Sequence, residues 1–132
     1  MSIGQTREGK GFRTTVLEVD QRVKAPSYAP PGPGTRWVLA RAKMCARNTA
    51  ETAASTDWTD YVVMDDNDGQ YDASGTSWST WPPLPQYPRD RKIAPGTCVT
   101  GWMLFTAPKS TKISKIGLLD GQGGFAAEWK LT

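Results

Sequence analysis

The side chains that could carry chemistry are few in this chain, and the most informative are two cysteines, Cys45 and Cys98. The chain has no histidine and no CxxC motif. Histidine is the commonest general base and zinc ligand, so its absence argues against Ser-His and Cys-His nucleophiles and against most zinc sites. Two cysteines allow only one intramolecular disulfide. We therefore expect no enzyme activity, no metal and no cofactor.

The acidic run DDNDG, from Asp65 to Gly69, is the one stretch that suggests a metal. An EF-hand loop with Gly69 at its sixth position would need a ligand at Met64 and a glutamate at Gly75, and the sequence supplies neither. We interpret the run as a hairpin turn. A weak oxygen site of another kind is the alternative.

The composition favours many short strands in one domain. The chain has 132 residues, with 13 glycines, 10 prolines and 6 tryptophans. Glycine and proline at this density punctuate short strands with turns, and this length builds one core rather than two. We expect a single all-β domain over residues 1–132. No stretch approaches the length of a membrane span, and a scattered net charge of +3 does not predict nucleic-acid binding.

Two stretches have the period-2 pattern of β-strands. The first, from Ala94 to Lys112, begins with a Pro-Gly turn and ends with a Pro-Lys turn, and its odd-numbered residues between Val99 and Phe105 share one face. The second, from Trp37 to Arg47, has only apolar residues at its even-numbered positions. We expect these positions to face the core and the odd-numbered ones to form an outer face.

Pairing the two stretches as antiparallel neighbours, with Cys45 opposite Cys98, gives a consistent register. It puts Arg41 beside Trp102 on the outer face and only apolar or small residues on the inner face. A shift by one residue would turn Arg41 and Lys43 into the core. Opposed antiparallel residues lie within disulfide range, so this register predicts a Cys45–Cys98 bond. Such a bond persists only in an oxidising compartment, and two reduced thiols are the alternative.

The remaining segments complete an antiparallel β-sandwich of seven to eight strands. A bulge is expected near Val16 and Leu17, and a helical turn is possible between Asn48 and Thr56. Four further strands and a terminal hairpin are expected at residues 3–8, 12–24, 58–64, 70–73, 113–119 and 125–131.

Large aromatic residues occur in the long loop from Ser74 to Asp90. Trp78, Trp81 and Tyr87 lie there among serine, threonine and proline. They could stack on a sugar ring, a peptide or a partner protein. The alternative is an internal cluster that pins the loop onto the sheet.

The outer face of the two paired stretches is a second candidate for binding. It carries Trp37, Arg41 and Trp102, and tryptophan and arginine are enriched at the energetic centres of protein interfaces. If no loop covers this face, it suits contact with another protein. The alternative is an intramolecular stack of Arg41 on Trp102.

Four segments, taken in order, resemble a known family. They are GQTREGKGFRTTVLEV, RWVLARAKMCARNTAE, VVMDDNDGQYD and APGTCVTGWMLFTAPKSTKISKIGL. The order is similar to that of the telokin-like, immunoglobulin-like domains of unknown function in exported proteins and lipoproteins of Gram-positive bacteria, and of a mycobacterial immunoprotective secreted protein. The residues that carry the likeness are Asn48, Asp65 to Tyr71, Pro95-Gly96, Gly101, Phe105 and Pro108. The resemblance implies an immunoglobulin-like sandwich, an extracytoplasmic location and no assigned activity.

These observations favour a non-enzymatic, exported binding domain that contacts another protein. The first residues, MSIGQTREGKG, have no signal segment, so we expect one to precede this portion in the natural precursor. Two alternatives remain. A carbohydrate-binding module would use the loop tryptophans on a cell-surface glycan, and a cytoplasmic or phage structural domain would have free thiols.

Overall fold

Strands make up almost all the regular structure of residues 1–48 and 54–131, which the computed structural model describes. This part of the chain has ten β-strands and one short 3₁₀ helix, η1 (Trp58–Asp60). The strands are β1 (Thr6–Glu8), β2 (Phe12–Asp20), β3 (Thr35–Ala46), β4 (Ala54–Thr56), β5 (Tyr61–Asp65), β6 (Gln70–Asp72), β7 (Arg91–Ile93), β8 (Cys98–Pro108), β9 (Ile113–Leu119) and β10 (Phe125–Lys130). No helix in the described part is long and apolar enough to cross a membrane.

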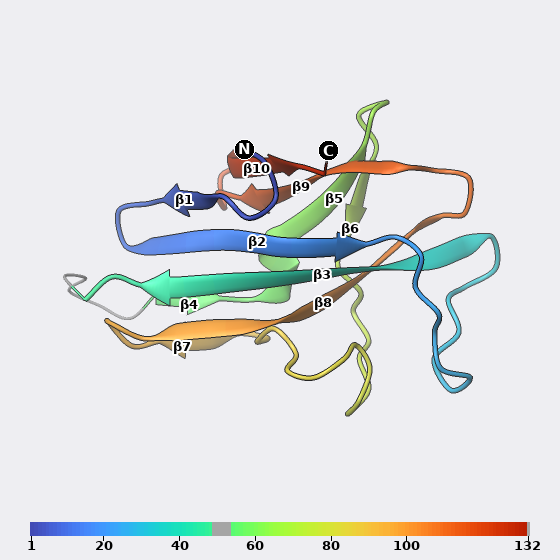
Figure 1. Cartoon of the computed structure of the whole chain (residues 1–132), viewed down its shortest axis with the longest axis horizontal. Helices are drawn as coiled ribbons and strands as arrows, with labels where there is room; N and C mark the ends of the chain where they lie inside the picture. Colours follow the sequence, from blue (N-terminus) through green and yellow to red (C-terminus); the bar gives the residue numbers. More distant parts are fainter. Residues whose placement is uncertain (49–53, 132) are drawn as a thin grey trace.

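The strands form two four-stranded sheets and one small two-stranded sheet (Figure 1). The first sheet has the order β1-β2-β3-β8, the second β10-β9-β5-β6, and β4 pairs with β7. All strand pairs within these sheets are antiparallel. The predicted antiparallel β-sandwich is confirmed. The strands exceed the expected seven to eight because the short pair β4–β7 has no clear period-2 pattern in the sequence.

The central pair of the first sheet, β3 and β8, has the predicted register throughout. Arg41 pairs with Trp102, Ala42 with Gly101, and Cys45 with Cys98. The two cysteines form a disulfide, and no free cysteine is found in the described residues. The register follows from burial, because any odd shift would place charged side chains between the sheets.

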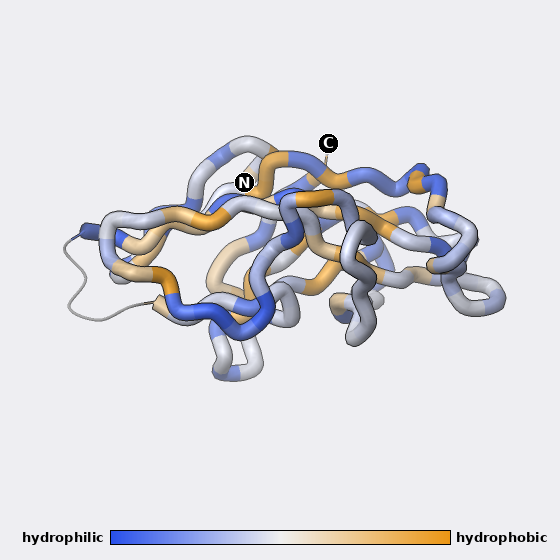
Figure 2. Tube along the Cα trace, turned by 90° about the horizontal axis from the view of Figure 1, so that it is seen from below, coloured by the Kyte–Doolittle hydropathy of each residue, from blue (hydrophilic) through white to orange (hydrophobic). Residues whose placement is uncertain are grey.

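The core lies between the two four-stranded sheets. Alternate residues of β3, from Val38 to Met44, are buried and face the second sheet. Met103 and Phe105 of β8 are buried in the same core. The second sheet contributes Tyr61, Val63, Ile116 and Trp129. Figure 2 shows hydrophobic segments, in orange, distributed along the whole trace between hydrophilic ones in blue. Burial of each large apolar side chain stabilises the fold by roughly 1.5 to 3 kcal/mol.

Several predicted boundaries differ from the structure. The strand region expected at residues 12–24 ends at Asp20 as β2, although its bulge is present between Val16 and Glu18. The strand expected at 58–64 begins only at Tyr61, because Asp57 caps η1 through a reciprocal hydrogen-bond pair with Asp60. In the segment with the possible helical turn, residues 54–56 form β4, and residues 49–53 lie outside the described part.

The acidic run forms the tight turn between β5 and β6. The Asp65 carboxylate accepts hydrogen bonds from the backbone N–H groups of Asn67 and Gly69 and from the Tyr71 hydroxyl, at 2.8, 2.8 and 2.6 Å. The Asp65 carboxylate thus holds the turn together. The Tyr71 hydroxyl and the two N–H groups hold the pKa of Asp65 below its ordinary value of 3.8.

Replacing Tyr71 with Phe should reduce the pH dependence of stability. A carboxyl group whose folded pKa is lowered contributes stability that is present above the unfolded pKa, about 3.9, and is lost as pH falls through the folded pKa. The melting temperature of Tyr71→Phe should therefore fall below that of the wild type at about pH 7 and approach it at about pH 2.5. The control is Tyr28→Phe, which removes a hydroxyl bonded to Thr80 rather than to a carboxylate. A deficit in Tyr71→Phe that is equal at both pH values would contradict the assignment.

Candidate interaction surface

The outer face of the first sheet gathers polar side chains into rows that cross the strands. One row consists of Glu8, Arg13, Cys45 and Cys98, and the next of Thr6, Thr15, Lys43 and Thr100. A third row consists of Glu18, Arg41 and Trp102. Each row follows from the period-2 alternation of its strands, since the inward positions are taken by the core. We call these three rows the outer-face surface.

Arg41 and Trp102 form the aromatic part of this surface. The Arg41 guanidinium carbon lies 5.7 Å from the centroid of the Trp102 ring, and its Nε donates to Glu18 Oε1 at 2.7 Å. The Arg41 side chain is 37% exposed, and Trp102 is half-buried. At such a site the stack is worth about 0.5 to 1 kcal/mol. The stack is therefore present, and it leaves Arg41 and Trp102 accessible to solvent.

A groove adjoins the stack at the disulfide end of the sheet. It consists of two depressions of about 400 and 230 Å³ that share Arg13 and Cys45. The residues that line it are Thr6, Glu8, Arg13, Thr15, Lys43, Cys45, Ala46, Arg47, Asn48, Gly96 and Cys98.

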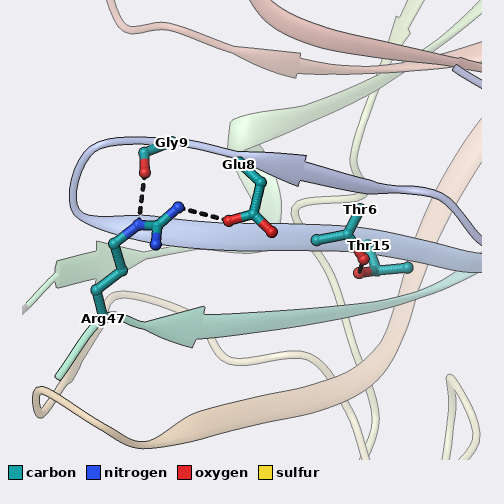
Figure 3. A network of polar contacts seen from close by, with 5 residues as sticks. All are labelled: Thr6, Glu8, Gly9, Thr15 and Arg47. Carbon is teal, nitrogen blue, oxygen red and sulfur yellow. Dashed lines mark hydrogen bonds and ion pairs between the residues drawn. The ribbon is translucent and has the colours of Figure 1, made fainter.

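Polar contacts organise one wall of the groove (Figure 3). Arg47 donates to the Gly9 carbonyl and to the Glu8 carboxylate, and the hydroxyls of Thr6 and Thr15 lie 2.7 Å apart. Glu8 is thus occupied by Arg47. Arg13 and Lys43 are exposed and make no ion pair within residues 1–48 and 54–131. The groove therefore carries a net positive charge.

The other end of the outer face is covered by loops. Trp37 is only 6% exposed and donates its indole N–H to the Ala29 carbonyl at 2.7 Å. The ring of Trp78 contacts Trp37 edge-on, with centroids 6.2 Å apart. Leu39 and Leu104 are buried there as well. The accessible patch is therefore smaller than the sequence suggested, because the loops before β3 and after β6 pack onto it.

The long loop is fastened to the edge of β8. Residues 85–87, which we call the strap, run beside Trp102, whose backbone N–H donates to the Pro85 carbonyl and whose carbonyl accepts from the N–H of Tyr87. Tyr87 is 1% exposed, and its hydroxyl bonds to those of Thr56 and Tyr61. Trp81 is 7% exposed. These observations favour the interpretation in which the loop aromatics pin the loop, and only Trp78 stays half-exposed.

The pKa values that burial raises belong to residues in and beside this buried network rather than to the groove. Burial raises the pKa of Tyr61 well above its ordinary value of 10.0, and burial also raises the pKa values of Tyr87 and Asp60. None of the three lines the groove. In the described part of the chain, no group of three or more His, Cys, Asp or Glu residues is placed to hold a metal. The outer-face surface offers cations, hydroxyls and one aromatic ring, which are groups for noncovalent binding.

Sequence reasoning placed Arg41, Lys43 and Trp102 on this surface but missed Arg13. The signal was available, because continuing the register from β3 to β2 sets Arg13 beside Cys45. The predicted register paired only the stretches that form β3 and β8 and did not extend to β2, so Arg13 was not assigned to this surface.

The fold defines this chain as a β-sandwich of the kind found in exported bacterial proteins. The structure is similar to the secreted protein MPT63 of Mycobacterium tuberculosis, with a TM-score of 0.72 and 12% identity over 98% of this chain and 95% of that one. It is also similar to the putative lipoprotein YcdA of Bacillus subtilis, with a TM-score of 0.69 and 9% identity over 99% of this chain and 38% of that one.

An uncharacterised β-sandwich protein of Clostridium difficile has a TM-score of 0.57 and 11% identity over 98% of this chain and 91% of that one. No protein-family model and no curated protein sequence matches the chain. At these identities the likeness concerns the fold. The structural neighbours are secreted, lipoprotein or uncharacterised β-sandwich proteins, as the sequence resemblance led us to expect.

Proposed function

We propose that this chain is a non-enzymatic, extracytoplasmic domain that binds another protein through its outer-face surface. The observation that carries the proposal is the accessible Arg41–Trp102 stack beside a groove in which Arg13 and Lys43 make no ion pair with any described residue. Tryptophan and arginine are enriched at the energetic centres of protein interfaces, and a side chain already held by stacking has less conformational freedom to lose on binding. The central strands beneath them are joined by a disulfide, so the surface is preorganised.

The extracytoplasmic location rests on two supports. A disulfide between adjacent strands persists in an oxidising compartment, and similar structures include a secreted protein and a putative lipoprotein. A cytoplasmic or phage structural domain would instead have two free thiols. Intact-mass measurement of the natural protein, alkylated with and without reductant, distinguishes the two, and two alkylated cysteines without reductant would reject the proposal.

The carbohydrate alternative has weaker support. A glycan-binding platform needs exposed ring faces, but Trp81 is buried and Trp78 packs between Trp37 and Tyr28. Quenching of the loop tryptophan fluorescence by soluble cell-surface glycans would support this alternative.

Replacing Trp102 with Ala should weaken partner binding by at least about tenfold and lower the melting temperature by only a few degrees. The ring is half-buried and stacks on Arg41, so its loss removes contact area more than core packing. The partner would be isolated from the cell envelope by cross-linking at Lys43, and its affinity for each variant measured by surface plasmon resonance.

The matched control is Phe125→Ala, which removes a half-buried aromatic side chain from the second sheet. Its affinity should equal that of the wild type. If Trp102→Ala loses much stability but binds the partner as well as the wild type does, the outer-face surface is not the interface.

A further inference from the structure

A second site of a different kind lies at the opposite end of the first sheet, around Arg36. Arg36 is the second residue of β3 and lies two positions before the inward-facing Val38, so its side chain turns inward at the open end of the sandwich. Its Nη1 donates to the Gln21 carbonyl at 2.6 Å, and its Nη2 donates to Gln21 Oε1 at 3.0 Å and to the Thr111 carbonyl. The guanidinium is therefore held in one orientation.

Gln21, which holds the Arg36 guanidinium, also connects the end of β2 in the first sheet to the start of β9 in the second. Its Nε2 donates to the Ile113 carbonyl and its Oε1 accepts from the Ile113 N–H, both at 2.8 Å. The segment between β8 and β9 is thereby fixed against the end of β2. A site built on Arg36 would be preorganised, because the backbone on both of its sides is tied down.

The positive charge of Arg36 lacks a counter-charge. All the acceptors of its hydrogen bonds are neutral, its buried Nε has no partner among the described residues, and it makes no ion pair there. A partly buried cation is costly unless an anion compensates it. The nearby Asp20 carboxylate accepts from the backbone N–H of Arg22 and does not pair with Arg36.

Three more basic side chains line the cleft that contains Arg36. A cleft of about 340 Å³ is lined by Gln21, Arg22, Arg36, Lys109, Ser110, Thr111 and Lys112. This lining has four basic side chains, two hydroxyls and no carboxylate. Arg22, Lys109 and Lys112 are exposed, so they can adjust to a ligand. Clustered cations of this kind focus a positive potential into the cleft.

We propose that this cleft binds a phosphate group. A guanidinium held in place, flanked by lysines and hydroxyl donors, matches the charge and the tetrahedral acceptors of phosphate better than those of a single carboxylate. The phosphate could belong to a soluble compound or to an anionic lipid headgroup, and the chemistry at the cleft is the same. The site is separate from the outer-face surface and does not depend on the protein partner proposed above.

The test is isothermal titration of the oxidised protein with inorganic phosphate and with pyrophosphate at constant ionic strength, using chloride as the reference anion. The wild type should bind at least one of these two phosphates or vesicles that contain phosphatidic acid, and the Lys109→Ala/Lys112→Ala double variant should bind the same probe at least about tenfold more weakly. Both lysines are exposed, so the variant should keep the wild-type melting temperature in chloride.

The control is Lys10→Ala/Lys92→Ala, which removes the same charge from exposed positions outside the cleft and should bind as the wild type does. Sedimentation with phosphatidylcholine vesicles, with and without phosphatidic acid, identifies the source. Lysine-dependent binding to phosphatidic acid alone assigns a lipid phosphate, and binding of soluble phosphates assigns a free one. Absence of binding to every phosphate probe, or equal weakening in both double variants, would overturn the proposal.

Discussion

Removing the Cys45–Cys98 bond is expected to lower the free energy of unfolding by about 4 kcal/mol. The bond joins residues 53 positions apart, and a closed loop of this size restricts the unfolded chain strongly. Urea denaturation of Cys45→Ala/Cys98→Ala should show a lower midpoint than the oxidised wild type. The fold should persist, because the β3–β8 register is also fixed by the core residues on the inner face.

Reduced wild-type protein is the matched control for this experiment. It retains both sulfur atoms but lacks the cross-link, so its midpoint should coincide with that of the double variant measured in reductant. An unchanged midpoint on reduction would show that the cross-link contributes no stability. If only the double variant were destabilised, the loss would come from packing of the cysteine side chains rather than from the bond.

Replacing Gly101 with Ala is expected to destabilise the fold by about 3 to 4 kcal/mol. A Cβ atom at this position would lie 2.2 Å from the backbone nitrogen of Tyr87 and 2.3 Å from the carbonyl carbon of Gln86. Backbone atoms cannot move aside as a flexible side chain can. The strap would have to separate from β8, and its hydrogen bonds with Trp102 and the burial of Tyr87 would be weakened.

The control for Gly101 is Gly75, which lies in the loop that carries the strap. A Cβ atom at Gly75 would meet nothing within 4 Å, so Gly75→Ala should leave the urea midpoint nearly unchanged. Hydrogen exchange of the Tyr87 backbone N–H would report whether the strap has separated in Gly101→Ala. If Gly101→Ala were as stable as the wild type, the strap would not lie against β8 in solution.

The central part of the fold could be predicted because charge and burial determine it together. Arg41 and Lys43 must face solvent, which excludes every odd shift of the β3–β8 pair, and placing Cys45 opposite Cys98 then selects the observed register. The strap could not be found in this way. Its proline-rich sequence has no period, and its attachment depends on backbone hydrogen bonds to Trp102 and on the space left by Gly101.

The cleft around Arg36, which we propose binds phosphate, was not predicted from the sequence for a different reason. Arg36 shares the parity of Val38, so the alternation already indicated an inward-facing cation at the start of β3. What the sequence did not show was its surroundings, since Gln21 and Thr111 come from segments far apart in the chain. A charged residue near the end of a strand, at a position that alternation assigns to the core, indicates a candidate polar site. Sorting residues only into inside and outside does not detect it.

The strap also changes what the edge of the first sheet presents to other molecules. β8 ends the order β1-β2-β3-β8, and an open edge strand is a template on which further chains can add and begin aggregation. The backbone groups of Trp102 and Leu104 on that edge are instead hydrogen-bonded to Pro85, Tyr87 and Ser74. Sheet extension is therefore blocked along this part of the β8 edge, so self-association there would have to use side chains.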